Sequence, residues 1–323
     1  MRLHRMAMVV ATILALAACA APTPALSPAD KPIPAEQVRT TDLKNLRPPS
    51  PDTSGLTYIP QTDELVIVDS EVEEGKYFRG VNMWGLTRRG VVQWTGSTLR
   101  YSREPSGVAY NPKTRRLFVS EDDADRVLEV RAGRDSRLGT EDDIVSGTDV
   151  QIFNDQDTED VALNTSTSEL LLVDAKIGRV HKLAPGSDGQ FNGISPKGDD
   201  RPGCPFDFAK LGAKDVEGLT YDAARDTIFL VSHHTNYVYE VTPTGELVTL
   251  IDISDTYPTK VAGVVRAPAS SADGTTSLYL VDRGVDNDKD PNANDGQLHE
   301  LRVHLPKHTP DKRAGGQQQP CSR

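Results

Sequence analysis

Ser106–Glu121 (SGVAYNPKTRRLFVSE) decides the fold, because its pattern recurs along the chain. The segment contains a short apolar strand, a polar turn and a stronger apolar strand that ends at an acid. Self-similarity at a fixed period of about 50 residues is typical of repeat architectures. The other copies are Ser54–Ser70 (SGLTYIPQTDELVIVDS), Glu159–Asp174 (EDVALNTSTSELLLVD), Glu217–Ser232 (EGLTYDAARDTIFLVS) and Ala262–Asp282, whose second strand is SLYLVD.

Two further strands accompany each repeat. A third strand is expected at Arg126–Arg131, Arg179–Leu183, Tyr237–Val241 and Gln297–Val303, with Asn82–Thr87 in the first unit. A fourth, outer strand is expected before each following repeat, at Thr98–Ser102, Val150–Phe153, Phe206–Ala209 and Leu247–Ile253. Four antiparallel strands per repeat form one blade of a β-propeller.

The sequence therefore predicts an all-β propeller of five four-stranded blades. A sixth blade within Glu71–Gln93 is the alternative. The last unit lacks an outer strand after Val303, and Gln37–Leu43 (QVRTTDL) has the character to fill that gap. The N-terminal strand would then close the ring and leave no exposed sheet edge. A β-sandwich explains neither the recurring Gly-x-x-Tyr start nor the phase of the turns.

The charge balance excludes one class of partner. The chain has 36 Lys+Arg against 47 Asp+Glu, a formal net charge of −11. This surplus of acids argues against a nucleic-acid partner, because the phosphate backbone requires neutralising cations. The sequence contains no P-loop, Rossmann glycine fingerprint, G-x-S-x-G elbow, H-E-x-x-H or C-x-x-C.

The N-terminus is typical of an exported protein. Met6–Ala18 is uncharged and follows a basic start, as in a signal peptide. The sequence Leu16-Ala17-Ala18-Cys19 resembles a bacterial lipoprotein box, which implies a lipid on Cys19 and an anchor on the outer face of the cell membrane, or in the outer membrane of a Gram-negative cell. The alternative is an ordinary cleavage site. We expect a signal at 1–18, a tether at 19–36, the propeller at 37–306 and a polar tail at 307–323.

Two further cysteines remain once Cys19 is assigned to the lipid. In an oxidising compartment Cys204 and Cys321 permit one disulfide, which would hold the polar tail against the domain. The alternative is two unpaired thiols.

The candidate site lies at one end of the propeller. Each first strand starts, and each second strand ends, on the same face of the ring, and most residues there are carboxylates. Packed carboxylates favour a cation among them, and a ring of oxygen ligands suits Ca²⁺ first. The alternative is that the acids cap strand ends and keep the face soluble. The residues predicted to lie on this face are Asp69, Glu121, Asp157, Asp174, Asp215, His234, Asp282 and Arg283.

Within this face Glu159 and Glu217 are the first candidates for metal ligands and for a general base. His233, with a pKa near neutrality, is a further candidate base. A second Ca²⁺ site is expected in Asp286–Gly296 (DNDKDPNANDG), from Asp286, Asp288, Asp290 and Asp295; the alternative there is a solvated turn.

Three pieces of sequence resemble bacterial secreted propellers, namely the esterase-like phytase, SdiA-regulated and NHL-type families. They are PSGVAY with RLFVSEDD, KDVEGLTY with TIFLVS, and VDRGVDNDKDPNANDGQLHEL. The resemblance implies a propeller over most of Val38–Val303. The Asp-x-Glu-Gly motif is also similar to gluconolactonase-type propellers, where the corresponding glutamate binds a divalent metal. That role falls on Glu217, and Glu159 matches less well because Asp160 replaces the glycine.

These observations leave three functional hypotheses. The first is a membrane-anchored propeller that binds a small-molecule or protein ligand without turnover. The second is a metal-dependent hydrolase of a phosphomonoester, ester or lactone, in which Glu159, Glu217 or His233 acts as the base. The third is an envelope scaffold with purely structural metal. We expect a monomer in each case.

Overall fold

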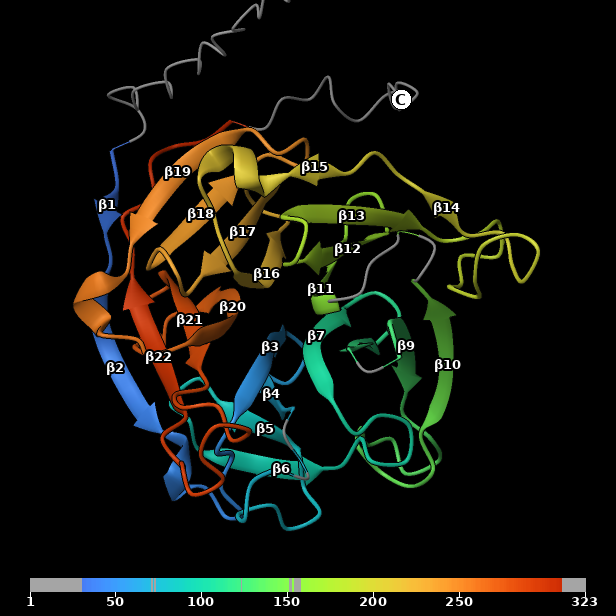
Figure 1. Cartoon of the computed structure of the whole chain (residues 1–323), viewed down its shortest axis with the longest axis horizontal. Helices are drawn as coiled ribbons and strands as arrows, with labels where there is room; N and C mark the ends of the chain where they lie inside the picture. The colour runs from blue at the N-terminus through green and yellow to red at the C-terminus, as the bar shows by residue number, and fades with distance from the viewer. Residues whose placement is uncertain are drawn as a thin grey trace, which may run out of the picture.

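The computed structural model describes residues 31–70, 72, 74–122, 124–150, 153 and 158–309. These residues form five sheets around a central axis, antiparallel except for one parallel pair at a sheet edge, and this is the predicted all-β five-bladed propeller (Figure 1). The strands β3, β7, β11, β16 and β20 are the innermost strands of their sheets. The other strands of each sheet lie farther from the axis.

The blades follow the chain in order. Blade 1 contains β3 (Thr53–Ile59), β4 (Glu64–Asp69), β5 (Met83–Thr87) and β6 (Val92–Gly96); blade 2 contains β7 (Pro105–Asn111), β8 (Arg116–Glu121), β9 (Arg126–Arg131) and β10 (Ile144–Asp149). Blade 3 contains β11 (Thr158–Asn164), β12 (Glu169–Asp174), β13 (Arg179–Ala184), β14 (Arg201–Pro202) and β15 (Phe206–Asp207). Blade 4 contains β16 (Val216–Asp222), β17 (Thr227–Ser232), β18 (Tyr237–Val241), β19 (Leu247–Asp252) and β1 (Ile33–Pro34); blade 5 contains β20 (Val261–Pro268), β21 (Thr276–Asp282), β22 (Gln297–Arg302) and β2 (Glu36–Asp42). Three short 3₁₀ turns are η2 (Leu43–Asn45), η4 (Phe208–Leu211) and η5 (Ser254–Thr256).

The N-terminal segment closes the ring as predicted. Strand β2 pairs antiparallel with β22, with Gln37 opposite Leu301 and Asp42 opposite Gln297. The preceding strand β1 pairs parallel with β19 of blade 4. Since β1 lies within the range 19–36 that the sequence assigned to a tether, the propeller already begins at Ile33. The N-terminus therefore contributes strands to two blades.

The inner three strands of every blade match the sequence pattern, but the outer strands of blades 1, 2 and 3 were misplaced. The expected strand Phe206–Ala209 is a strand only at Phe206–Asp207 (β15), and Phe208 and Ala209 belong to the 3₁₀ turn η4. Segments Thr98–Ser102 and Val150–Phe153 were expected to be strands, whereas β6 and β10 end just before them. Thr98, Ser102 and Val150 are buried in the connections to the next blade, and this burial gave them a strand-like pattern. The alternative of a sixth blade is excluded and the five predicted blades are confirmed, because the segment after Val81 forms β5 and β6 of blade 1.

Apolar side chains fill the space between neighbouring blades. One core cluster lies at each of the five blade interfaces. Between blades 1 and 2, for example, Val66 and Val68 of β4 pack with Leu117 and Val119 of β8, and all four are fully buried. Burial of apolar surface on both faces of each sheet therefore holds the blades together.

Backbone crowding at the axis requires a residue without a side chain. A Cβ atom at Gly55 would lie 2.8 Å from the Cα of Gly107, and one at Gly218 would lie 2.9 Å from the Cα of Gly263. A Cβ at Gly263 would lie 2.7 Å from the carbonyl oxygen of Ser54. The inner strands thus approach backbone to backbone, which only glycine permits.

Asp160 occupies the equivalent axial position in blade 3. Its side chain accepts hydrogen bonds from the backbone N–H groups of Val161 and Leu219, both at 2.8 Å, and from that of Val108. These donors belong to blades 3, 4 and 2. Complete burial raises the pKa of Asp160 well above its usual value. The carboxyl group therefore joins three blades at the axis.

Substituting Gly107→Ala should destabilise the propeller by about 1–3 kcal/mol, because the new methyl would overlap Asp160. The added Cβ would lie 2.6 Å from the Cα of Asp160. Denaturant unfolding measures the change. The control is Gly147→Ala in the outer strand β10, where the nearest atom is a flexible Leu128 methyl at 3.1 Å. Equal stability losses in the two variants would contradict the axial constraint.

Candidate functional site

The channel mouth is the end of the ring where the first strand of each blade starts and the second strand ends. The register places these ends together: Thr53 opposes Asp69, Pro105 opposes Glu121 and Thr158 opposes Asp174. In blades 4 and 5 the pairs are Val216 with Ser232 and Val261 with Asp282. The antiparallel hairpin therefore brings two separate sets of side chains to one face.

A cavity of about 80 Å³ lies at this mouth. Most of its lining comes from two repeated positions, namely the residue before the axial position and the residue after the end of the second strand. Blades 1 to 4 contribute hydroxyl or acidic side chains, whereas blade 5 contributes a cation. The lining residues are Ser54, Ser70, Glu104, Ser106, Asp122, Glu159, Glu217, Ala262 and Arg283.

Of the sequence-predicted residues, Glu159, Glu217 and Arg283 are brought together in this cavity. Glu159 and Glu217 start neighbouring blades, which explains their convergence. The serines at the same position have a second role, because Ser54 Oγ donates to the carbonyl oxygen of Pro105 and Ser106 Oγ to that of Thr158, each at 2.9 Å. Each serine thus ties its blade to the next one.

The acids that end the second strands are chiefly structural. The carboxylate of Asp282 accepts hydrogen bonds from the backbone N–H groups of Thr259 (2.6 Å), Lys260 (2.7 Å) and Gly284 (2.9 Å). Asp174 accepts one from the N–H of Ile177 at 3.0 Å. These contacts organise the adjacent connections, as the alternative interpretation of the acidic face proposed.

Glu121 is paired rather than aimed at the cavity. Its carboxylate is buried and accepts a hydrogen bond from Arg126 Nε, while Arg126 Nη2 donates to the carbonyl oxygen of Tyr101 at 2.9 Å. Glu121 is therefore part of the framework of blade 2.

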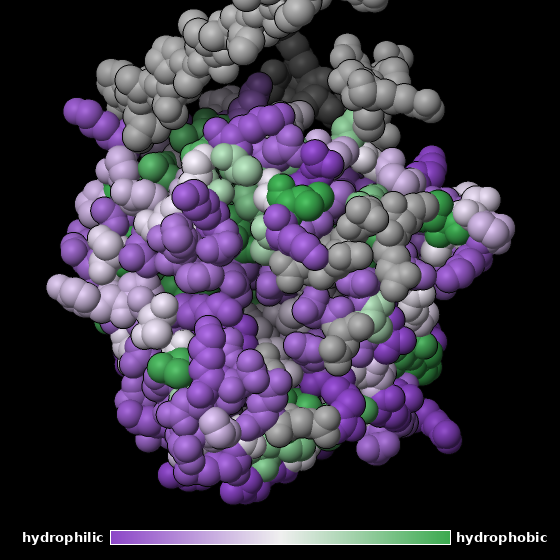
Figure 2. All heavy atoms as spheres, in the orientation of Figure 1, coloured by the Kyte–Doolittle hydropathy of each residue, from purple (hydrophilic) through white to green (hydrophobic). Residues whose placement is uncertain are grey.

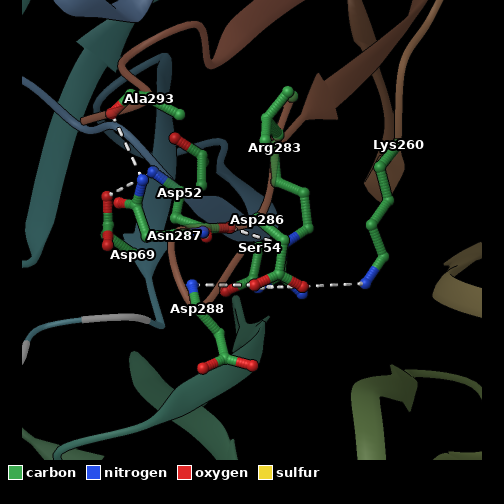
Figure 3. Close-up of polar contacts among 12 residues, drawn as sticks. Asp52, Ser54, Asp69, Lys260, Arg283, Asp286, Asn287, Asp288 and Ala293 are labelled. Atoms are coloured by element: carbon green, nitrogen blue, oxygen red, sulfur yellow. Dashed lines mark hydrogen bonds and ion pairs between the residues drawn. The ribbon is translucent and has the colours of Figure 1, made fainter. Parts of the chain in front are cut away.

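Arg283 is held by a buried acidic network between blades 5 and 1. Its side chain is only 9% exposed, and Nε donates to Asp52 Oδ1. The other oxygen of Asp52 accepts from the backbone N–H of Asn287 at 2.8 Å, and the N–H of Asp52 donates to Asp69 at 3.0 Å (Figure 3). Burial, reinforced by the neighbouring charge of Asp52, raises the pKa of Asp69 to about 6.

Glu217 faces two basic side chains. Its Oε1 lies 3.4 Å from His233 Nδ1 and 3.6 Å from Lys260 Nζ. Burial lowers the pKa of His233 despite the attraction of Glu217, which favours the neutral imidazole. The neighbouring pair of His234 Nδ1 and Asp215 Oδ2, 3.5 Å apart, is more than half exposed and lies away from the cavity lining.

The expected metal ligands are not grouped in the described part of the chain. Within those ranges no group of three His, Cys, Asp or Glu side chains lies close enough to hold an ion. The Asp286–Gly296 loop instead directs its acids to its own backbone: Asp286 accepts from the N–H of Asp288, Asp290 from that of Asn292 and Asp295 from that of Val285. The hydrogen bonds from Asn292 also lower the pKa of Asp290. This is the geometry of a polar turn.

Several predicted features lie outside the described residues. Asp157, Cys19 and Cys321 are among them, together with the signal segment 1–18. Cys204 is disulfide-bonded, and its pairing with Cys321 stays a prediction. No helix in the described part of the chain is long and apolar enough to cross a membrane. The surface in Figure 2 is largely hydrophilic, with small separate hydrophobic areas.

Lys260 was missed, although the repeat contained a signal for it. Three residues before the axial position the other blades have Asp52, Glu104, Asp157 and Asp215, and blade 5 alone has a lysine. Aligning the starts of the first strands position by position would have identified this change of charge.

Comparison with known proteins supports the fold and leaves the family open. No known protein family and no curated protein matches the sequence. The structure is similar to a glutaminyl cyclase from Myxococcus xanthus, with a TM-score of 0.52 and 12% identity over 86% of this chain and 100% of that chain. It is also similar to a luciferin-regenerating enzyme (TM-score 0.49, 13% identity, 82% and 95% covered) and to virginiamycin B lyase from Staphylococcus aureus (0.41, 10%, 82% and 98%).

The likeness to the glutaminyl cyclase agrees with the β-propeller fold of the described residues. At such low identity the likeness concerns the fold alone. The expected membership of the phytase-like families therefore has no support from sequence comparison.

The raised pKa of Asp69 predicts a pH-dependent contribution to stability. Its folded pKa of about 6 exceeds the usual 3.8, so the stability from burying the neutral acid is present below about pH 4 and is lost as the pH rises through about 6. Asp69→Asn should therefore gain up to about 3 kcal/mol relative to the wild type between pH 4 and pH 7.5. Urea unfolding at several pH values measures this difference, and parallel curves for the two proteins would refute it.

Proposed function

We propose that this protein is an exported, lipid-anchored binding protein whose channel mouth recognises a ligand bearing a cationic group. The observation that carries this proposal is the cavity, in which acids from three successive blades face one space. The anchor would be the lipid on Cys19 expected from the sequence. The ligand would be an ammonium or guanidinium compound, either free or part of a larger molecule.

The charges around the cavity favour a cation. Four carboxylates line it, from Glu104, Asp122, Glu159 and Glu217, against one lining cation, Arg283. Arg283 is also paired with buried Asp52. Carboxylates gathered in a confined space repel one another, and a bound cation relieves that repulsion.

The hydrogen-bonding groups suit a cation that carries several N–H donors. The carboxylates accept only, and Ser54 Oγ, which donates to the carbonyl oxygen of Pro105, has lone pairs that can accept from a ligand N–H. Ser106 Oγ donates to the carbonyl oxygen of Thr158 and also contacts Ser120 Oγ at 3.0 Å. The acceptors come from different blades and surround the space. A planar guanidinium or a primary ammonium can reach several of them at once.

The expected calcium ion is less well supported than an organic cation. A Ca²⁺ ion requires six to eight oxygen ligands at about 2.3–2.6 Å, and no three His, Cys, Asp or Glu side chains of the described residues are grouped closely enough to begin such a shell. Calcium therefore remains a competitor to be included in the binding test.

The alternative of a metal-dependent hydrolase rests on one observation, the His233–Glu217 pair beside the cavity. A neutral imidazole held 3.4 Å from a carboxylate can accept a proton from water or a substrate hydroxyl. The described residues do not fit the metal that this hypothesis requires. An assay of phosphomonoesters, esters and lactones, with Ca²⁺ or EDTA, should show no turnover, and turnover that His233→Gln abolishes would favour the hydrolase instead.

Binding of agmatine provides the direct test. The wild-type protein should bind agmatine in calorimetry, and the affinity should fall as salt rises because the attraction is electrostatic. Glu159→Gln and Glu217→Gln should each weaken binding about tenfold, as expected for loss of a charged hydrogen-bond partner. An uncharged analogue, N-butylacetamide, should not bind.

The control is Glu141→Gln, which makes the same charge change at an exposed position in the β9–β10 connection, away from the cavity lining. This variant should bind agmatine as the wild type does. Absence of binding, or equal weakening by all three substitutions, would contradict a cation site at the channel mouth. Preferential binding of Ca²⁺ over agmatine would show that the ligand of this site is the metal and not an organic cation.

A further inference from the structure

We infer that Lys260 is a built-in cation that competes with the ligand for Glu217 and thereby sets which cations bind. This inference rests on the proposed function. Lys260 lies three residues before the axial Gly263, at the position where the other four blades carry an acid. One blade thus supplies a positive charge to a face that is otherwise acidic.

The ammonium group of Lys260 is held by charge rather than by close hydrogen bonds. Its Nζ lies 3.6 Å from Glu217 Oε1 and 3.9 Å from Asp286 Oδ2, and the side chain is 22% exposed (Figure 3). Both distances exceed the usual range for an N–H···O hydrogen bond, which ends near 3.2 Å. The group is therefore attracted to both acids without being locked to either.

The backbone of Lys260, in contrast, is fixed. Its N–H donates to Asp282 at 2.7 Å, and its carbonyl oxygen accepts from the N–H of Arg283 at 2.9 Å. Only the flexible four-carbon side chain is left to move. It can turn toward solvent without disturbing strand β20 or the Arg283 network.

A ligand cation that contacts Glu217 must take the place of Lys260. Asp286 keeps a second partner after the exchange, because Arg283 Nη2 also lies 3.9 Å from its Oδ2. Displacement costs Lys260 two partly screened contacts, with Glu217 and with Asp286. A guanidinium, which donates several hydrogen bonds, compensates for this loss better than an alkali ion or a simple ammonium. Lys260 is in this way a specificity-determining residue.

The test compares Lys260→Gln and Lys260→Arg with the wild type in calorimetric titrations with agmatine and with butylammonium. Removing the internal cation should tighten agmatine binding about fivefold, the equivalent of one such ion pair. Butylammonium should gain at least as much, so that selectivity for the guanidinium falls. Lys260→Arg keeps the positive charge. It should therefore bind agmatine as weakly as the wild type does and keep the wild-type selectivity for the guanidinium over butylammonium.

Lys289→Gln is the matched control, since it removes one positive charge from an exposed position in the 284–296 loop and does not line the cavity. Its agmatine affinity should stay at the wild-type value, and thermal melting verifies that every variant is folded. Equal affinities of the wild type and Lys260→Gln would overturn the competitor role while leaving the proposed function intact. Weaker binding by Lys260→Gln would instead make Lys260 part of ligand recognition. No binding by either protein would refute the proposed function, and this inference with it.

Discussion

The crowding of five backbones at the axis is the constraint on which the rest of the structure depends. Because the inner strands touch without side chains between them, each repeat must place a glycine, or in blade 3 the bonded Asp160, at the same point. That requirement fixes how far each strand reaches toward the axis. It also fixes the position of the neighbouring residues, which are the ones that line the cavity.

The same arrangement separates the framework from the residues that vary. The ends of the second strands keep acids such as Asp282 and Asp174, whose hydrogen bonds with backbone N–H groups hold the connections. The residue just before the axial position of each first strand is free to differ. It is serine in blades 1 and 2, glutamate in blades 3 and 4, and alanine in blade 5. An asymmetric, acidic site thus arises on a nearly symmetric scaffold without disturbing the repeat.

Most of the fold could be predicted from the sequence, because strand alternation and turn spacing repeat with the blades. Closure of the ring by the N-terminal strand, which the structure places at Glu36–Asp42, could be predicted because the last blade was one strand short. The outer strands β6 and β10 could not be placed, since they are half exposed and lack a strong apolar pattern. For the site, topology predicted that Glu159 and Glu217 would meet. It could not show that Asp282 is occupied by backbone N–H groups, or that Lys260 reaches Glu217, because both depend on side-chain direction.

The closing strand has a consequence for how the protein comes into being. Strand β2 is made before any blade, yet its partner β22 is among the last parts of the chain to be synthesised. Until then blade 5 has an open edge, and the emerging polypeptide carries unpaired N–H and C=O groups of the kind that attract other strands. Correct folding therefore waits for the end of synthesis, and a chain that stops short of Gln297 has no partner for its own beginning.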